Sequence, residues 1–426
     1  MKLRLGTLAV VFAALAPFAL AQEHWVATWA ASPQQPRAAA PAAAQSGRGT
    51  PQGPPPVTSF HNQTVHMVVH TSIGGRRARV QLSNLFGTGP LAIGAVHIAL
   101  RDKDSAIAAG SDRALSFNGK PSCAIPPGAS LLSDAVDLNV PPTGDLLISV
   151  YLPGDSGPLT THATALHTTY ISQPGDFTAA PALADATTTR SYYWITDVEV
   201  MAPTAASAIV TLGDSITDGT ASTVDTDRSW PADLARRLAA NPATAQIAVL
   251  NEGIAGNRLL RENAGPSALA RFDRDVLGLP GVKWITLLEG INDIGRGTGP
   301  GALPDDSVTA EDVIGAMRQL VERAHAHGIK VIGCTLTPYA GATYYSDTGE
   351  EIRQAVNRWI RTGGAFDAVV DFEAAVKDPA NPKQIRADFN ERDHLHPNDA
   401  GYKAMAEAID LSLFTGKTAG TGAGSR

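Results

Sequence analysis

Between residues 58 and 201, apolar side chains recur at every second position, which is the pattern of β-strands with one buried face. The alternation runs from Val65 to Val69, is interrupted by Gly74-Gly75, and resumes from Ala78 to Leu82. Further strand candidates are His24–Ala30, Ala95–Leu100, Leu146–Leu152 and Tyr192–Val200. Because stretches of helical period are hard to find here, we predict that residues 22–203 form a β-sandwich of jelly-roll-like type.

Beyond Met201 the pattern changes, and apolar runs alternate with amphipathic stretches of helical period. The strand candidates are a run beginning near Ala208 and the segments Ile247–Leu250, Trp284–Leu288, Lys330–Leu336 and Ala368–Phe372. Helices are predicted over Trp230–Ala240, Pro266–Leu277, 309–328, Glu350–Arg361 and from Pro397 to about Phe414. Repeated strand–helix units favour a parallel sheet covered by helices on both faces. We therefore predict a second, α/β domain over residues 204–417.

Three further segments differ in composition from these two predicted domains. Residues 1–21 combine Lys2 and Arg4 with an apolar run and a small-x-small ending at Ala21. This is typical of a cleaved secretory signal peptide; the alternative, a membrane anchor, needs a longer apolar run. Residues 34–56 are rich in Ala, Pro, Gly and Gln, which predicts a mobile insertion, and residues 418–426 are predicted to be a disordered tail. The leader predicts export to the periplasm or the extracellular space.

Charge and cysteine content narrow the class of protein. The 426 residues are 44% hydrophobic and carry a net charge of −7, without long runs of one sign. This balance predicts a globular protein with no nucleic-acid partner and no membrane insertion once the signal is cleaved. The two cysteines, Cys123 and Cys334, fall in different predicted domains. We expect both to be free, although an oxidising compartment leaves a disulfide between them open.

Polar residues suited to acyl transfer follow the apolar runs of the second domain. Ser215 comes directly after the first run, Gly256 and Asn292 follow the second and third, and Asp393 and His396 precede the last helix. A serine hydroxyl needs a base to take its proton and donors to hold the resulting oxyanion. Gly256 offers a backbone N–H and Asn292 an amide donor. An aspartate three residues before a histidine can orient the imidazole and stabilise its cation.

These residues stand in four sequence blocks that resemble those of the SGNH (GDSL) hydrolases. The blocks are Gly213-Asp214-Ser215, Gly256, Gly290-Ile291-Asn292-Asp293 and Asp393-His394-Leu395-His396-Pro397. The resemblance covers about half of the chain and implies a three-layer α/β/α flavodoxin-like fold. It further implies a nucleophile at Ser215, a base at His396 and its orienting acid at Asp393. The oxyanion donors that it implies are the Ser215 and Gly256 N–H groups and the Asn292 amide, with no cofactor and no metal.

The first domain bears on the substrate. Segments 71–75 and 82–87 resemble the β-domain of secreted bacterial proteins related to xylan esterases. This resemblance implies a carbohydrate ester as substrate, with an O-acetyl group on a plant or microbial polysaccharide as the expected case. A lipase or short-chain acyl esterase without sugar preference and a non-catalytic carbohydrate-binding protein stay open. Because Tyr192–Val200 runs almost directly into the next strand, we expect the two domains to share a packed interface.

Two smaller questions concern the last sequence block. Asp393, His394 and His396 form a metal-ligand grouping, but no further His or Cys cluster completes such a site. Position 394 varies within the family, so we expect His394 to be incidental. The oligomeric state is not predicted by any feature of the sequence.

Overall fold

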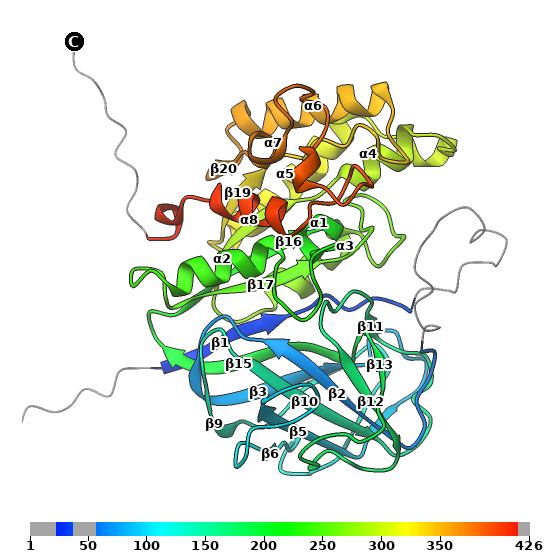
Figure 1. Ribbon diagram of the computed structural model, residues 1–426, viewed down its shortest axis with the longest axis vertical. Helices are drawn as coiled ribbons and strands as arrows, with labels where there is room; N and C mark the ends of the chain where they lie inside the picture. Colours follow the sequence, from blue (N-terminus) through cyan, green and yellow to red (C-terminus); the bar gives the residue numbers. More distant parts are fainter. Residues whose placement is uncertain (1–22, 37–56, 416–426) are drawn as a thin grey trace, which may run out of the picture.

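The computed structural model describes residues 23–36 and 57–415 (Figure 1). The predicted signal peptide at 1–21, most of the predicted insertion at 34–56 and the predicted tail at 418–426 lie outside the described residues. The predicted start of the insertion is too early. Gln34 is buried, its backbone forms a bridge to Thr161, and its side chain donates to the carbonyl of Ala264 at 2.6 Å.

The first half of the described chain is sandwich-like and built from antiparallel sheets, as predicted. One sheet has the order β1-β15-β3-β8, with β9 also paired to β3. Its strands are β1 (Glu23–Ala30), β3 (Gly75–Ser83), β8 (Ser130–Leu132), β9 (Val136–Val140) and β15 (Ile195–Pro203). The other sheet has the order β13-β12-β2-β10-β5-β6. Its strands are β2 (Gln63–His70), β5 (Ala95–Leu100), β6 (Arg113–Ala114), β10 (Asp145–Leu152), β12 (Thr169–Pro174) and β13 (Thr187–Thr189).

Two short strand pairs complete this domain. The burial of its side chains accounts for the apolar patterns of its sequence. The pairs are β4 (Leu91–Ile93) with β7 (Cys123–Ile125) and β11 (Thr161–His162) with β14 (Tyr192–Tyr193). In β3 the side chains of Ala78, Val80 and Leu82 are fully buried while the intervening Arg79 and Gln81 are partly exposed, which is the alternation read from the sequence. The central strands β2 and β10 are buried along almost their whole length.

The second half holds a parallel five-stranded sheet in the order β17-β16-β18-β19-β20. Its strands are β16 (Ser207–Gly213), β17 (Ile247–Gly253), β18 (Val282–Leu288), β19 (Lys330–Cys334) and β20 (Ala368–Val370). This is the flavodoxin-like order, with the first strand between the second and the third. The carboxyl ends of the strands therefore meet at one edge, where ligands bind in such sheets. The predicted α/β/α class is confirmed.

Eight α-helices of the described chain cover the parallel sheet (Figure 1). They are α1 (Ser215–Asp218), α2 (Trp230–Ala239), α3 (Ala268–Phe272), α4 (Ile291–Thr298), α5 (Ala310–Ala326), α6 (Asp347–Thr362), α7 (Phe372–Val376) and α8 (Asp399–Glu407). A π-helical turn, Asp273–Leu277, continues α3, and 3₁₀ turns lie at Pro304–Asp306, Ala387–Phe389 and Leu411–Phe414. No helix among these residues is long and apolar enough to cross a membrane.

The prediction of one final helix to Phe414 is wrong. Helix α8 ends at Glu407, and the chain resumes as the 3₁₀ turn Leu411–Phe414. The side chain of Asp410 accepts hydrogen bonds from the backbone and the hydroxyl of Ser412, at 2.9 and 2.7 Å. An aspartate bonded to its own backbone in this way favours a new turn over a continued helix.

The two domains share a packed interface, as expected. Strand β1 lies against the edge of the parallel sheet next to β17 (Figure 1), and the Ala27 N–H donates to the Pro280 carbonyl at 3.1 Å. The Ser72 hydroxyl donates to the Val249 carbonyl at 2.7 Å. Buried apolar residues of both halves form one continuous cluster. Cys123 and Cys334, both in the described part of the chain, are free.

Candidate active site

Ser215 is the first residue of α1 and follows the carboxyl end of β16. Asp214 caps this short helix, because its Oδ1 accepts from the backbone N–H of Ile216 at 2.9 Å. The turn is tight: a Cβ on Gly213 would lie 2.5 Å from the carbonyl oxygen of Leu288. At the start of a helix the N–H groups have no intrahelical acceptor. The Ser215 N–H is therefore suited to receive an anion beside its own hydroxyl.

The structure brings Ser215, His396 and Asp393 together in a chain of two hydrogen bonds. The Ser215 Oγ lies 2.8 Å from Nε2 of His396, and Nδ1 of His396 lies 2.5 Å from Oδ2 of Asp393. With the Nδ1 proton donated to the carboxylate, Nε2 is left to accept the serine proton. Burial raises the pKa of Asp393, but its hydrogen bond to His396 prevails and lowers the pKa to about 2. Asp393 is therefore ionised at neutral pH.

Local hydrogen bonds hold the loop that carries His396. Oδ1 of Asp393 accepts from the backbone N–H groups of Leu395 and His396, both at 2.9 Å, which leaves Oδ2 for the imidazole. The Asn390 side chain spans the loop and donates to the carbonyl of His396 at 3.2 Å. His394 is exposed and adopts a left-handed φ of 60°, a conformation that glycine adopts with least strain.

Asn292 and Gly256 lie beside this chain of hydrogen bonds. Asn292, in the first turn of α4, donates from Nδ2 to the carbonyl of Asn257 at 2.9 Å, and its Oδ1 accepts from the Tyr344 hydroxyl at 3.3 Å. These two partners fix which side of the amide bears the nitrogen, and they leave the second Nδ2 hydrogen for another acceptor. Gly256 has a φ of 82° and lines the same cleft as Ser215.

Two buried acids act as scaffold around these groups. Asp293 accepts from the backbone N–H groups of Leu259 and Leu260, at 2.7 and 3.0 Å, and so fixes the loop after Gly256. Burial raises the pKa of both Asp293 and Asp214 above the usual range. A carboxyl that favours its neutral form opposes a neighbouring oxyanion less than a carboxylate does.

The comparison with protein families gives the class of the domain that carries these residues. The model of the GDSL-like lipase/acylhydrolase family matches residues 211–404, an interval that contains Ser215, Gly256, Asn292, Asp393 and His396. The C-terminal half is a GDSL-family (SGNH) hydrolase domain. A comparison with curated protein sequences finds no match.

Solved structures similar to this chain cover about half of it. A lipolytic protein of the G-D-S-L family from Desulfitobacterium hafniense is 24% identical over 47% of this chain and 97% of its own, with a TM-score of 0.36. A GDSL-like lipase from Bacteroides thetaiotaomicron is 21% identical over 49% and 87%, with a TM-score of 0.36. An acetylxylan esterase from Geobacillus stearothermophilus is 22% identical over 47% and 91%, with a TM-score of 0.38.

A buried arginine ties together the strand ends of the GDSL-family domain. Arg271 donates to the carbonyls of Gly213 and Glu252 and to Oδ1 of Asn257, at 3.0, 2.7 and 3.0 Å. Asp275, one turn later, pairs with it at 3.1 Å. Arg271 therefore connects the turn before Ser215 to the loop after Gly256.

The site opens into a cleft of about 800 Å³ that both domains line. Four of the predicted site residues, Ser215, Gly256, Asn292 and His396, reach its surface. The GDSL-family domain adds polar side chains, including Glu262, Asn263 and Arg296, and the N-terminal domain adds Gln35, Pro36 and Phe86.

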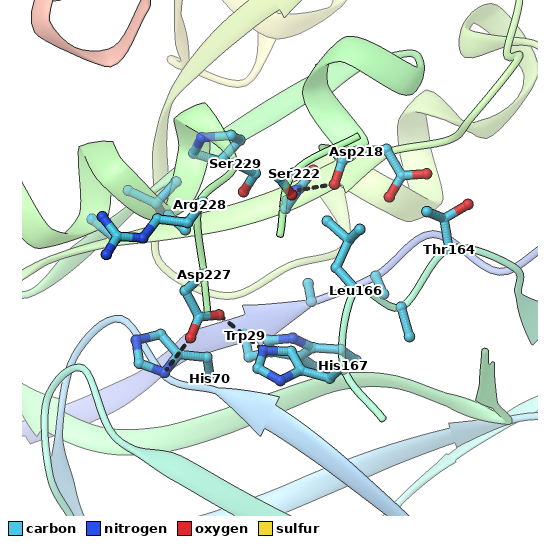
Figure 2. A pocket seen from close by; sticks show the side chains of 18 of the residues that line it. Trp29, His70, Thr164, Leu166, His167, Asp218, Ser222, Asp227, Arg228 and Ser229 are labelled. Atoms are coloured by element: carbon cyan, nitrogen blue, oxygen red, sulfur yellow. Dashed lines mark hydrogen bonds and ion pairs between the residues drawn. The ribbon is translucent and has the colours of Figure 1, made fainter. Parts of the chain in front are cut away.

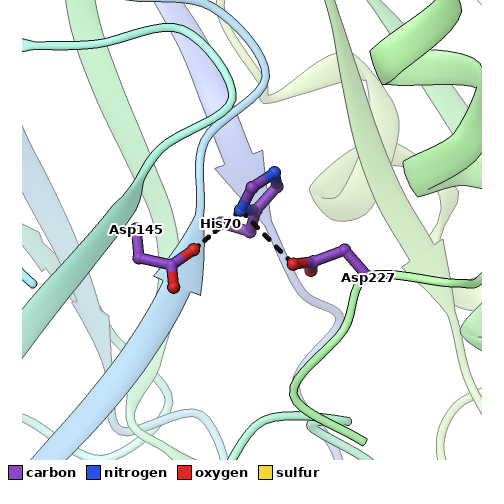
Figure 3. A group of neighbouring side chains, drawn as sticks. All are labelled: His70, Asp145 and Asp227. Carbon is purple, nitrogen blue, oxygen red and sulfur yellow. Dashed lines mark hydrogen bonds and ion pairs between the residues drawn. The ribbon is translucent and has the colours of Figure 1, made fainter. Parts of the chain in front are cut away.

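A second hollow, of about 100 Å³, lies between the domains and holds a separate ionic network (Figure 2). His70, Asp145 and Asp227 place ligand atoms within 4.8 Å of one another, a spacing that a metal ion could use (Figure 3). However, Nδ1 of His70 lies 2.7 Å from Asp145 and 3.4 Å from Asp227, and Arg101 pairs with Asp145 at 2.8 Å. Asp145 is thus held by the His70 ring and the Arg101 guanidinium, and Asp227 accepts a hydrogen bond from His167 at 2.9 Å, so these carboxylates already have partners within the protein.

Sequence reasoning missed Tyr344, Arg271, Asp218 and His162, the last two of which link the domains. Tyr344 and His162 come from segments far from the motifs, and their neighbours in sequence give no signal. Arg271 carries one weak signal, an aspartate four residues later on the same predicted helix.

Proposed function

We propose that this protein is an exported serine esterase that removes O-acetyl groups from carbohydrate. The hydrogen-bonded chain Ser215–His396–Asp393 at the surface of a cleft carries the proposal. The Ser215 Oγ attacks the ester carbonyl carbon as its proton passes to Nε2 of His396. Asp393 stabilises the imidazolium that forms. His396 then returns the proton to the leaving alcohol, and a water molecule releases the acyl group by the same steps.

The tetrahedral intermediate carries a negative oxygen that needs donors. The Ser215 and Gly256 N–H groups and the second Nδ2 hydrogen of Asn292 fill this role in the proposal. Tyr344 supports it by holding Oδ1 of Asn292 away from the anion. The raised pKa of Asp214 limits negative charge next to the serine.

The lining of the cleft favours a polar alcohol over a lipid. Gln35, Glu262 and Asn263 offer hydrogen-bond partners to sugar hydroxyls, and the Phe86 ring offers an apolar face of the kind that sugar rings contact. Gln35 and Phe86 belong to the N-terminal domain, so that domain forms part of the proposed substrate site. Export is proposed from the leader-like residues 1–21 alone.

A panel of esters tests the proposal. We expect acetylated xylan or an acetylated monosaccharide to be hydrolysed with a kcat/KM above that of a p-nitrophenyl butyrate or octanoate by about tenfold or more. Ser215→Ala is the matched control and should be inactive on all of them. A preference for the octanoate would identify a lipase instead. A folded wild-type protein that hydrolyses no ester would contradict the enzyme assignment.

A further inference from the structure

Asp218 links the active site to the N-terminal domain. It closes α1, three residues after Ser215, and its side chain is buried. The two carboxylate oxygens take different partners: Oδ2 accepts from the backbone N–H of Ala255 at 2.8 Å, and Oδ1 faces Nε2 of His162 at 3.1 Å.

The hydrogen bond from the Ala255 N–H to Asp218 helps to fix the loop that carries the proposed oxyanion donor Gly256. Ala255 precedes Gly256, whose φ of 82° sets the direction of the next peptide groups. The buried carboxylate of Asp218 fixes the Ile254–Ala255 peptide, which immediately precedes the peptide that carries the Gly256 N–H. Asn257, on the other side, is held by Arg271 and Asn292. The loop is therefore anchored at both ends, and Asp218 is the anchor on the Ala255 side.

His162 holds the carboxylate in place from the other domain. It lies in β11, is 5% exposed, and directs both ring nitrogens at acceptors: Nε2 at Asp218 and Nδ1 at the carbonyl of Ser32, at 3.0 Å. Only the doubly protonated ring donates to both. Burial opposes this charge, but the carboxylate of Asp218 raises the pKa of His162 above its usual value.

We propose that His162 is a positioning residue for the oxyanion hole, acting through Asp218 on the Ala255–Gly256 backbone. The inference rests on the proposed esterase function and gives the N-terminal domain a part in catalysis. Without His162, Asp218 would be a buried carboxylate with one oxygen unpartnered and would shift or draw in water. The Ala255 N–H would then lose its fixed acceptor, and the Gly256 N–H its direction.

The interface supplies a matched control. His167 also crosses between the domains and donates from Nε2 to Asp227 at 2.9 Å (Figure 2). Like His162 it is buried and paired with an aspartate, but Asp227 lies in the segment before α2. His167→Ala therefore removes an interdomain His–Asp pair of the same chemistry without touching the Ala255–Gly256 loop.

Steady-state kinetics on p-nitrophenyl acetate separate the two pairs. We expect His162→Ala to lower kcat by roughly 10- to 100-fold with KM almost unchanged, the size expected from a small misplacement of catalytic groups. His162→Gln, whose amide can still donate to Asp218, should recover part of the loss. His167→Ala should keep kcat within about twofold of the wild type, whatever its effect on melting temperature. If His162→Ala does not fold, His162→Leu fills more of the space and should show the same loss.

Amide hydrogen exchange gives a readout that does not depend on activity. The peptide containing Ala255 should exchange faster in His162→Ala than in the wild type and in His167→Ala. Equal kcat losses in the two alanine variants, a change in KM alone, or unchanged exchange at Ala255 would overturn the inference. If the proposed esterase function is wrong, the wild type will hydrolyse no ester. The exchange measurement still tests whether His162 fixes the Ala255 N–H through Asp218.

Discussion

Two His–Asp pairs lie at the two ends of α1 and show how surroundings set the role of the same two side chains. In the pair His396–Asp393 one ring nitrogen faces a carboxylate and the other faces the Ser215 hydroxyl at the cleft. In the pair His162–Asp218 both ring nitrogens face acceptors, and the ring is sealed between domains. The first histidine has a free lone pair and can take a proton. Both nitrogens of the second histidine are directed at fixed acceptors within the protein, so its role is to position.

The largest effect that separates the two roles is expected from removing the base. His396→Ala should lower kcat by roughly 10⁴-fold or more, because among the residues that the structure describes His396 is the base that contacts the Ser215 hydroxyl. The exposed neighbour is the control: His394→Ala should change kcat by less than about threefold. Equal losses at the two positions, together with inhibition by a chelator, would favour the metal alternative for this loop.

The next effect concerns the donors that the proposed function assigns to the oxyanion. Asn292→Ala should lower kcat by roughly 10²–10³-fold with little change in KM, because the anion exists only in the transition state. Tyr344→Phe leaves the amide in place and removes only its hydroxyl partner, so its loss should be much smaller. A change confined to KM in Asn292→Ala would assign this side chain to substrate binding.

The smallest expected effect concerns His167, the control histidine at the interface between the domains. Burial lowers the pKa of His167, but its ion pairs with the carboxylates of Asp225 and Asp227 prevail and raise it to about 9. A histidine with a raised pKa contributes stability that is complete below its unfolded value of about 6.5 and is lost as the pH rises through about 9. The melting temperature of the wild type should therefore decrease as the pH is raised from about 6.5 to about 9. The melting temperature of His167→Gln should decrease less over the same pH range. Parallel curves for the two proteins would contradict the assigned charge.

The sequence predicted the parts of the site that sit at strand ends. Ser215, Gly256 and Asn292 each follow an apolar run, and the topology of a parallel sheet brings such positions to one edge. Helix α4 was not predicted, because its glycines count against a helix. The structure shows why one of them is there: a Cβ on Gly295 would lie 2.2 Å from the Tyr344 ring.

The residues that support the site from other segments could not be predicted, and the physical reason is a different one. His162 and Tyr344 reach the site through the packing of segments that no local pattern connects to it. His162 is 56 positions from Asp218, in a two-residue strand of another domain. The predicted final helix is too long because the apolar period continues to Phe414. In the structure α8 ends at Glu407, and the local hydrogen bonds of Asp410 start a separate 3₁₀ turn.

The central claim is that Ser215 is the nucleophile and that His396 activates it, and covalent labelling tests it most directly. A fluorophosphonate reacts with an activated serine, which displaces fluoride and keeps the phosphonyl group. After treatment of the full-length protein, mass spectrometry should find one adduct, on the peptide containing Ser215. His396→Ala should be labelled far more slowly, and Ser215→Ala should not be labelled at all. An adduct on a different residue, or efficient ester hydrolysis by a folded Ser215→Ala protein, would contradict the account.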